Sequence, residues 1–113
     1  MTKRQKYRID CRIWIVGENG TFLGAGRVKL MQEIGKWGSI SKAAKKLGMS
    51  YRKAWESVEA INMEAEKPLV VKTSGGKGGG GAILTLEGKK AIKNYLRIVK
   101  NTEVYITKQL QTF

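Results

Sequence analysis

The stretch from Gly38 to Trp55, GSISKAAKKLGMSYRKAW, decides how this chain of 113 residues folds. In its first half, alanine and leucine recur at the spacing of the inner face of a short helix. We expect this helix to begin at Ser39 or Ser41 and to end before Gly48. Gly48 suits the left-handed backbone of a tight turn, and Ser50 suits the cap of a following helix. Two short helices joined by a glycine turn are the helix-turn-helix pattern.

Helical periodicity continues on both sides of this stretch. Upstream, an apolar stripe predicts a helix that begins near Gly26 and is ended by Gly35 and Gly38. Downstream, the second helix of the pair continues to about Ala65, and Pro68 prevents any continuation. The expected inward residues are Val28, Leu30, Met31, Ile34 and Trp37 in the first helix, and Ala54, Val58 and Ile61 in the third.

The sequence after Pro68 predicts a wing and then a long helix. Residues 69–73 and 82–85 favour strands, and a glycine-rich stretch separates them. Residues 86–112 contain no helix breaker except Gly88 and predict one amphipathic helix. Such a helix is too long for a small core to cover, so part of its stripe should contact a partner helix. Two sets of residues are expected at that contact: Ile92, Val99 and Ile106, which repeat at intervals of seven, and Leu96 and Leu110, which follow the same interval on either side of Glu103.

The amino-terminal region predicts a β-hairpin over residues 8–23. Apolar and polar residues alternate from Tyr7 to Val16, which is the period of a half-buried strand. Glycine and an Asn-Gly pair in residues 17–20 suit the turn, and residues 21–23 would form the return strand. Cys11 falls on the apolar face, so we expect it to be a small core residue and not a reactive thiol.

The composition restricts the classes of function. Lysine and arginine number 22 against 9 acidic residues, which gives a net charge of +13 and favours nucleic acid, then an anionic membrane, as the partner. A single cysteine and the absence of histidine exclude an internal disulfide, the usual zinc sites and a histidine base. We therefore expect no metal, no cofactor and no catalysis. The chain has no apolar run for a membrane span and no signal core, so we expect a cytoplasmic protein.

Basic residues gather at the predicted helix pair. No acidic residue occurs between Lys36 and Lys53, whereas glutamates crowd the far end of the third helix. The electropositive amino-terminal end of that helix therefore fits the major groove of DNA, with Arg52 as the candidate to read a guanine edge. Trp55 fits a DNA contact or the core equally well. The candidate DNA contacts are Ser39, Ser41, Lys42, Lys45, Ser50, Tyr51, Arg52, Lys53, Trp55, Lys72 and Lys77.

Each of these signals has a plainer interpretation. The lysines of the second helix fit phosphate contacts or solubility charges. Lys77 in the glycine-rich wing fits a phosphate or minor-groove contact, or a hairpin that touches nothing. A nucleotide-binding loop is not predicted, because Lys77 is followed by Gly78 and then a strand, not by serine or threonine and a helix.

Other classes of binding protein remain as alternatives. The basic surface could bind an acidic protein partner, or nucleic acid without sequence preference. RNA is disfavoured because no strand carries a platform of paired aromatic residues. The basic carboxy-terminal helix lacks tryptophan on its apolar face, so membrane binding is also disfavoured.

The chain resembles a known family over residues 8 to about 100. The residues that carry the resemblance are FLGAGR at 22–27, GSISKAAKKLGMSYRKAW at 38–55, PLV at 68–70 and GGKGGGGAILT at 75–85. Together they are similar to the amino-terminal domain of the ModE-type molybdate-responsive transcriptional regulators, which is akin to the winged helix-turn-helix of LysR-type regulators.

The resemblance implies a homodimer that binds double-stranded DNA. It implies that Ser50, Tyr51, Arg52 and Trp55 belong to the recognition helix, that Lys77 belongs to the wing, and that the long helix contributes to dimerisation. Family members continue into an oxyanion-binding domain, and the sequence ends at Phe113 without one. We therefore expect a stand-alone DNA-binding version that does not bind molybdate directly.

The expected fold is a single domain of the α+β class, mainly α, over residues 1–113. Its parts are a hairpin at 8–23, three helices in 24–66, a wing at 69–85 and a dimerisation helix at 86–112.

Overall fold

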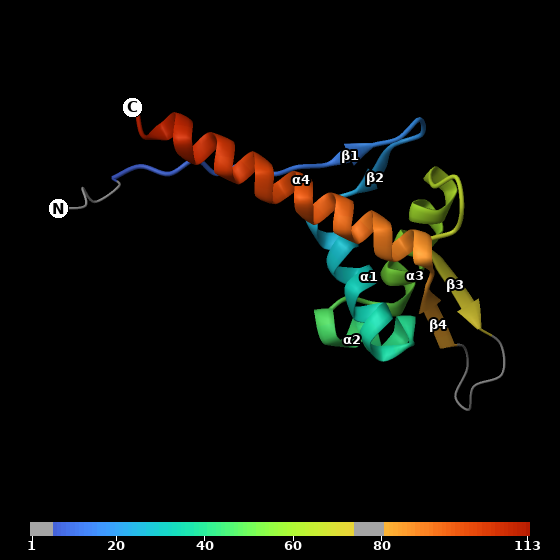
Figure 1. Cartoon of the computed structure of the whole chain (residues 1–113). Coiled ribbons are helices and arrows are strands. Elements are labelled where there is room, and N and C mark those ends of the chain that lie inside the picture. The colour runs from blue at the N-terminus through green and yellow to red at the C-terminus, as the bar shows by residue number, and fades with distance from the viewer. Residues whose placement is uncertain (1–5, 74–80) are drawn as a thin grey trace.

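A computed structural model describes residues 6–73 and 81–113, which form helices and two small antiparallel sheets (Figure 1). The elements in order are β1 (Ile15–Val16), β2 (Thr21–Leu23), α1 (Ala25–Trp37), α2 (Ile40–Leu47), α3 (Tyr51–Glu64), β3 (Val70–Thr73), β4 (Gly81–Leu84) and α4 (Leu86–Leu110). The fold is mainly α with a short wing after the helix pair. This confirms the winged helix-turn-helix class expected from the sequence.

Local sequence signals fix the ends of the first three helices. The hydroxyl of Ser39 accepts a hydrogen bond from the Lys42 amide at the start of α2, and Ser50 does the same for the Lys53 amide at the start of α3, both at 3.1 Å. Gly38 and Gly48 adopt left-handed backbone angles, with φ of 66° and 67°, at the ends of α1 and α2. The prediction that Gly35 also ends the first helix was wrong, because that residue lies within α1.

The hydrophobic core lies where α1, α2 and α3 meet the base of the wing and the first half of α4. Small residues on α2 and α3 allow the two helices to approach closely, and larger aliphatic side chains of α1 fill the centre. The buried residues are Leu23, Val28, Leu30, Met31, Ile34, Ile40, Ala43, Ala44, Ala54, Val58, Ile61, Leu69, Val70, Ala82 and Tyr95.

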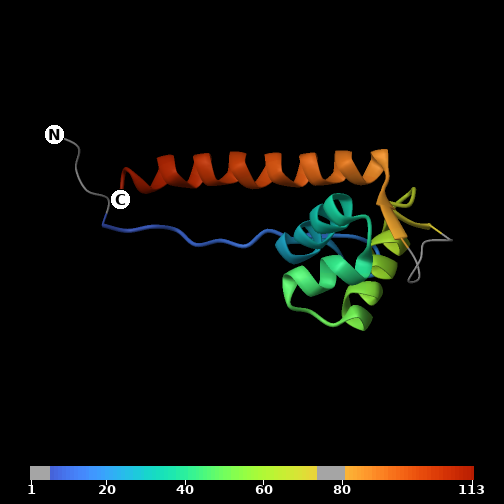
Figure 2. The ribbon, with the colours of Figure 1, turned by 90° about the horizontal axis from the view of Figure 1, so that it is seen from below.

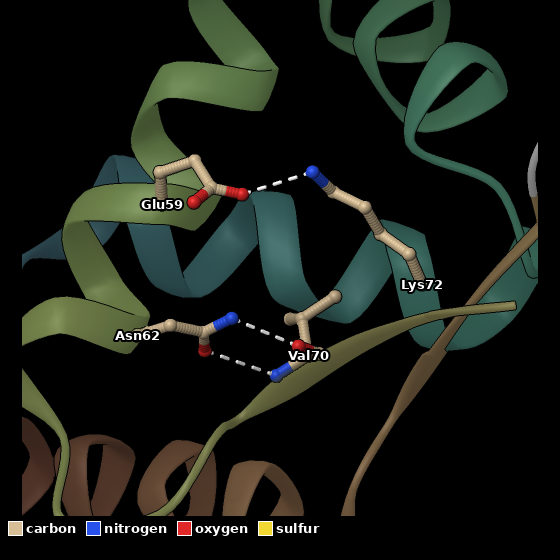
Figure 3. A network of polar contacts seen from close by, with 4 residues as sticks. All are labelled: Glu59, Asn62, Val70 and Lys72. Carbon is tan, nitrogen blue, oxygen red and sulfur yellow. Dashed lines mark hydrogen bonds and ion pairs between the residues drawn. The ribbon is translucent and has the colours of Figure 1, made fainter.

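Asn62 connects α3 to the wing. Its Nδ2 donates to the Val70 carbonyl at 2.9 Å, and its Oδ1 accepts from the Val70 amide at 3.3 Å (Figure 3). The same Oδ1 also accepts from the Leu69 amide at 2.9 Å. One side chain therefore satisfies three partly buried backbone groups where β3 begins. These bonds fix the wing against α3.

The junction between the wing and α4 is equally close. The Thr85 hydroxyl caps α4 by accepting from the Gly88 amide at 3.0 Å, and it also lies 2.8 Å from the Pro68 carbonyl, to which it donates. Gly88 is buried, and a Cβ there would overlap the Leu69 carbonyl oxygen. Glycine at this position therefore allows α4 to begin directly against the chain that enters the wing.

Helix α4 extends well beyond the core, and the amino-terminal segment runs beside it (Figure 2). Tyr95 joins the two, since its buried hydroxyl donates to the Ile13 carbonyl at 2.8 Å. Burial raises the pKa of the Tyr95 hydroxyl above its ordinary value, because the charged phenolate would lose its hydration.

The prediction of an amino-terminal strand over residues 7–16 was wrong. Only Ile15 and Val16 pair with β2, and residues 6–14 are extended but form no ladder. Period-two patterning requires a partner strand to become a sheet, and within the described residues only Thr21–Leu23 provide one. Cys11 is exposed, so its expected place in the core was also wrong.

Replacing Asn62 with alanine should destabilise the domain by about 1–3 kcal/mol, because backbone groups at the start of β3 lose their partners. The measurement is the free energy of unfolding from urea denaturation. Met63→Ala on the same helix is the control, since Met63 is 75% exposed and its truncation should have little effect. Equal stabilities of the two variants would contradict the assigned role of Asn62.

Gly88→Ala should lower the melting temperature despite the better helix propensity of alanine. The overlap with a backbone carbonyl should cost about 1–3 kcal/mol, against a gain of about 1 kcal/mol from propensity. Gly26→Ala in α1 is the matched control, because a Cβ there meets nothing within 4 Å. We expect Gly26→Ala to stabilise the chain slightly, and a Gly88→Ala variant as stable as that control would contradict the close junction.

Candidate nucleic-acid interface

The exposed face of α2 and the first turn of α3 is rich in basic residues. Most of the candidate contacts are exposed to solvent, as expected for a surface that meets a polyanion. The exposed candidates are Ser41, Lys42, Lys45, Ser50, Tyr51, Arg52, Lys53, Trp55 and Lys72, whereas Ser39 is half-buried. The hydroxyls of Ser39 and Ser50 are used as helix caps, so both serines position the ends of helices that face the same region.

Arg52 projects from the first turn of α3. Its Nε lies 3.2 Å from Oε1 of Glu56, one turn further along, and the side chains are 89% and 58% exposed. An exposed pair at this spacing is worth about 0.3–0.5 kcal/mol, so it does not hold the guanidinium away from another acceptor. The arrangement leaves Arg52 free to form a bidentate contact.

Trp55 lies between the core and the solvent. Its side chain is 38% exposed, and the Lys72 Nζ lies 4.4 Å from the ring centroid. Lys72 belongs to β3 and also pairs with Glu59 of α3 at 2.9 Å. The structure therefore brings Trp55 and Lys72 together where α3 faces β3.

Trp37 is a feature of this surface that sequence reasoning missed. It was expected to lie in the apolar stripe of α1, but it is 38% exposed and its indole N–H donates to Glu33 Oε2 at 2.8 Å. The ammonium groups of Lys46 and Lys36 lie 4.7 and 5.6 Å from its ring centroid. The available signal was the basic residues near Trp37, because an aromatic ring next to several cations suits a basic surface better than a core.

The base of the wing is joined to the helix pair. The Ala82 amide donates to the Gly38 carbonyl at 2.9 Å, so β4 is fixed to the turn before α2. Strands β3 and β4 pair in register from Val70 opposite Leu84 to Thr73 opposite Gly81. Lys77, the wing residue proposed to contact DNA, lies outside the described residues.

The candidate dimerisation residues on α4 divide into two groups. Ile92 and Val99 pack partly on the core of their own chain, whereas Ile106 and Leu110 line a small hollow with Tyr7 and Ile9. Leu96 is 45% exposed and borders a groove of about 560 Å³ between α4, the start of α1 and residues 11–14. The apolar residues of α4 that remain exposed are Leu86, Leu96, Ile98, Val104 and Tyr105, four of which the spacing by sevens did not include.

The described residues carry neither a metal-binding cluster nor a membrane-spanning helix. In residues 6–73 and 81–113 no group of three or more histidine, cysteine, aspartate or glutamate side chains is placed to hold a metal ion. No helix within these ranges combines the length and apolar character needed to cross a membrane.

Comparisons with known proteins match the region that carries this surface. Residues 25–89 match the model of the bacterial regulatory helix-turn-helix proteins of the lysR family. The chain is 42% identical over 99 residues to the molybdenum-pterin-binding protein MopB of Rhodobacter capsulatus, covering 88% of this chain and 35% of that protein. It is 43% identical over 74 residues to the DNA-binding transcriptional dual regulator ModE of Escherichia coli K12, covering 66% and 28%.

A third relative gives the same result. The molybdenum transport protein ModE of Azotobacter vinelandii is 41% identical over 88 residues, which cover 78% of this chain and 33% of that protein. The chain thus spans about a third of the length of these relatives. The family match extends over α1, the helix pair, the wing and the start of α4. The chain therefore belongs to the lysR family of bacterial regulatory helix-turn-helix proteins.

Proposed function

We propose that this chain binds specific DNA sequences with the amino-terminal end of α3 in the major groove and the wing on the backbone or in the minor groove. The observation that carries the proposal is the exposed basic surface of α2 and α3, which contains no acidic residue between Lys36 and Lys53. The amino-terminal end of α3 adds the positive end of its helix dipole to this surface. Phosphates and base edges are the acceptors that such a surface suits.

The side chains divide into two roles within this proposal. Arg52 reads a guanine edge, because its guanidinium is exposed and weakly held. Ser41, Lys42, Lys45, Tyr51 and Lys53 contact phosphates and sugars, and so fix the position of the protein on the duplex without reading sequence. Trp55 and Lys72 contact the DNA backbone where it passes between α3 and the wing.

We further propose that the chain acts as a homodimer through α4. The exposed apolar residues of this helix and the groove beside Leu96 offer a surface that a second copy would cover. A dimer would place two recognition helices in half-sites one or more helical turns, about 34 Å or its multiples, apart. The proposal includes a cytoplasmic location and no catalysis. It does not include molybdate binding, although two relatives are named for molybdenum, because they are matched over only about a third of their length.

The central test is selection of duplexes from a random library by the purified chain. The selected duplex and a base-shuffled duplex of equal length are then compared by equilibrium binding over a series of salt concentrations. A specific regulator should prefer the selected duplex by about a thousandfold or more. Equal affinities that fall steeply with salt would leave a non-specific nucleic-acid binder, and no binding to either duplex would favour an acidic protein partner.

Arg52→Ala should cost about 1–3 kcal/mol of binding free energy for the selected duplex and should relax the preference at one base pair. Lys42→Ala is the comparison, since loss of a phosphate contact should weaken all duplexes alike and reduce the salt slope by about one. The measurement is affinity for a panel of duplexes with single base-pair changes. An unchanged preference in Arg52→Ala would contradict the assignment of the recognition helix.

Leu96→Asp should convert the dimer to monomers, because a charge would be placed in an apolar contact. Light scattering after size exclusion measures the mass. The affinity for a duplex that carries both half-sites should fall when the dimer is lost. Met63→Asp introduces the same charge at an exposed position on α3, outside the proposed surface, and should leave the mass unchanged. A dimeric Leu96→Asp variant would argue against the proposed surface.

A further inference from the structure

One of the candidate DNA-binding cations, Lys72, forms an ion pair with a carboxylate of the same chain. Glu59 Oε1 lies 2.9 Å from the Lys72 Nζ, and the two side chains are 47% and 44% exposed (Figure 3). The same ammonium lies 4.4 Å from the centroid of the Trp55 ring. Lys72 thus has an anionic partner and an aromatic partner in the free protein, and both belong to α3.

The position of this contact follows from the spacing along α3. Trp55, Glu59 and Asn62 are separated by four and three residues, so they form one stripe on the helix, and the contacts of all three lead to β3. Asn62 fixes the start of the strand, which places Lys72 opposite the other two side chains. The ammonium therefore lies at the gap between the recognition helix and the wing, the two elements proposed to contact the duplex.

We propose that Glu59 competes with DNA for Lys72. In the free protein the Glu59 carboxylate binds the ammonium, and in the complex a backbone phosphate replaces the carboxylate while the Trp55 ring keeps the lysine in place. Glu59 thereby sets the affinity for the duplex without contacting it. This inference rests on the proposed DNA-binding function.

The exposure of both partners makes the exchange favourable. A half-exposed ion pair is screened by water and is weak, so a phosphate that gains by releasing counterions can displace the carboxylate. The displaced Glu59 side chain regains water, and no buried unpaired charge is left behind. The cation–π contact is not broken by an incoming anion, and it limits the freedom of the lysine between the two states.

The neighbouring ion pair shows why Glu59 is the residue concerned. Arg52 and Glu56 lie on the same helix and are more exposed, at 89% and 58%, and no aromatic ring contacts Arg52 within the described residues. A pair within one helix can open by rotation of side chains alone. The Glu59–Lys72 pair joins α3 to β3, residues 13 apart in the sequence, so its exchange changes what connects the recognition helix to the wing.

The test is a double-mutant cycle on DNA affinity. The wild-type chain, Glu59→Gln, Lys72→Gln and the double variant are titrated with one duplex over a series of salt concentrations, after thermal melts confirm that each is folded. Both exchanges keep the size of a half-exposed side chain, and Glu59→Ala with Lys72→Met provides a second cycle. Glu59→Gln should bind about two- to fivefold more tightly than wild type, the equivalent of a surface ion pair. In the Lys72→Gln background, Glu59→Gln should change the affinity no more than the charge control Glu66→Gln does.

The control is Glu66→Gln, which changes the net charge equally at an exposed position beyond the end of α3. It should alter affinity less than Glu59→Gln and by the same factor in both backgrounds. An equal gain from Glu59→Gln with and without Lys72 would overturn the inference in favour of direct repulsion of phosphate by Glu59. Weaker binding by Glu59→Gln would overturn it too, since the pair would then be needed in the complex. A wild-type chain that binds no duplex would overturn the proposed function and this inference together.

Discussion

The side-chain amide of Asn62 is the contact on which the arrangement of the binding surface depends. A helix pair and a two-stranded wing have few apolar residues with which to hold each other, and the described part of the wing buries only Leu69, Val70 and Ala82. Three hydrogen bonds from one amide replace packing at this point, because they satisfy backbone groups that neither element can satisfy alone. Asn62 therefore sets the direction in which β3, the first strand of the wing, leaves α3.

The remaining junctions extend this constraint through the domain. Thr85 and Gly88 attach α4 to the carbonyl groups before β3, and Gly38 attaches β4 to the turn before α2. Each contact uses a backbone group or a small polar side chain, so the three elements meet with little intervening volume. As a result, two lysines that are distant in the sequence each lie over a tryptophan ring at the surface of the domain. Lys46 lies over Trp37, and Lys72 lies over Trp55.

The sequence predicted well the features that depend on near neighbours. Ser39, Ser50, Gly38 and Gly48 fix helix ends through contacts within four residues, so the helix pair could be located without a structure. The strand over residues 7–16 failed because alternation shows which face is apolar but not whether a partner strand exists. Asn62 and Glu59 were not identified as anchor and counter-ion, since their partners lie on a later strand whose packing angle no spacing rule gives. Trp37 was misplaced because apolar character alone does not separate a core aromatic from one that binds cations.

The projection of α4 beyond the core gives one helix two different environments. Its first half contacts the core through Tyr95, whereas among the described residues its last turns are covered only by the extended segment 6–10, with an edge contact between the rings of Tyr7 and Phe113 at 5.7 Å. Opening of the outer turns exposes little apolar area, and opening of the inner turns disrupts the whole core. Amide protons of a single continuous helix should thus exchange with solvent at rates that increase steadily from Tyr95 toward Leu110, and a second copy seated on the outer half would flatten that gradient.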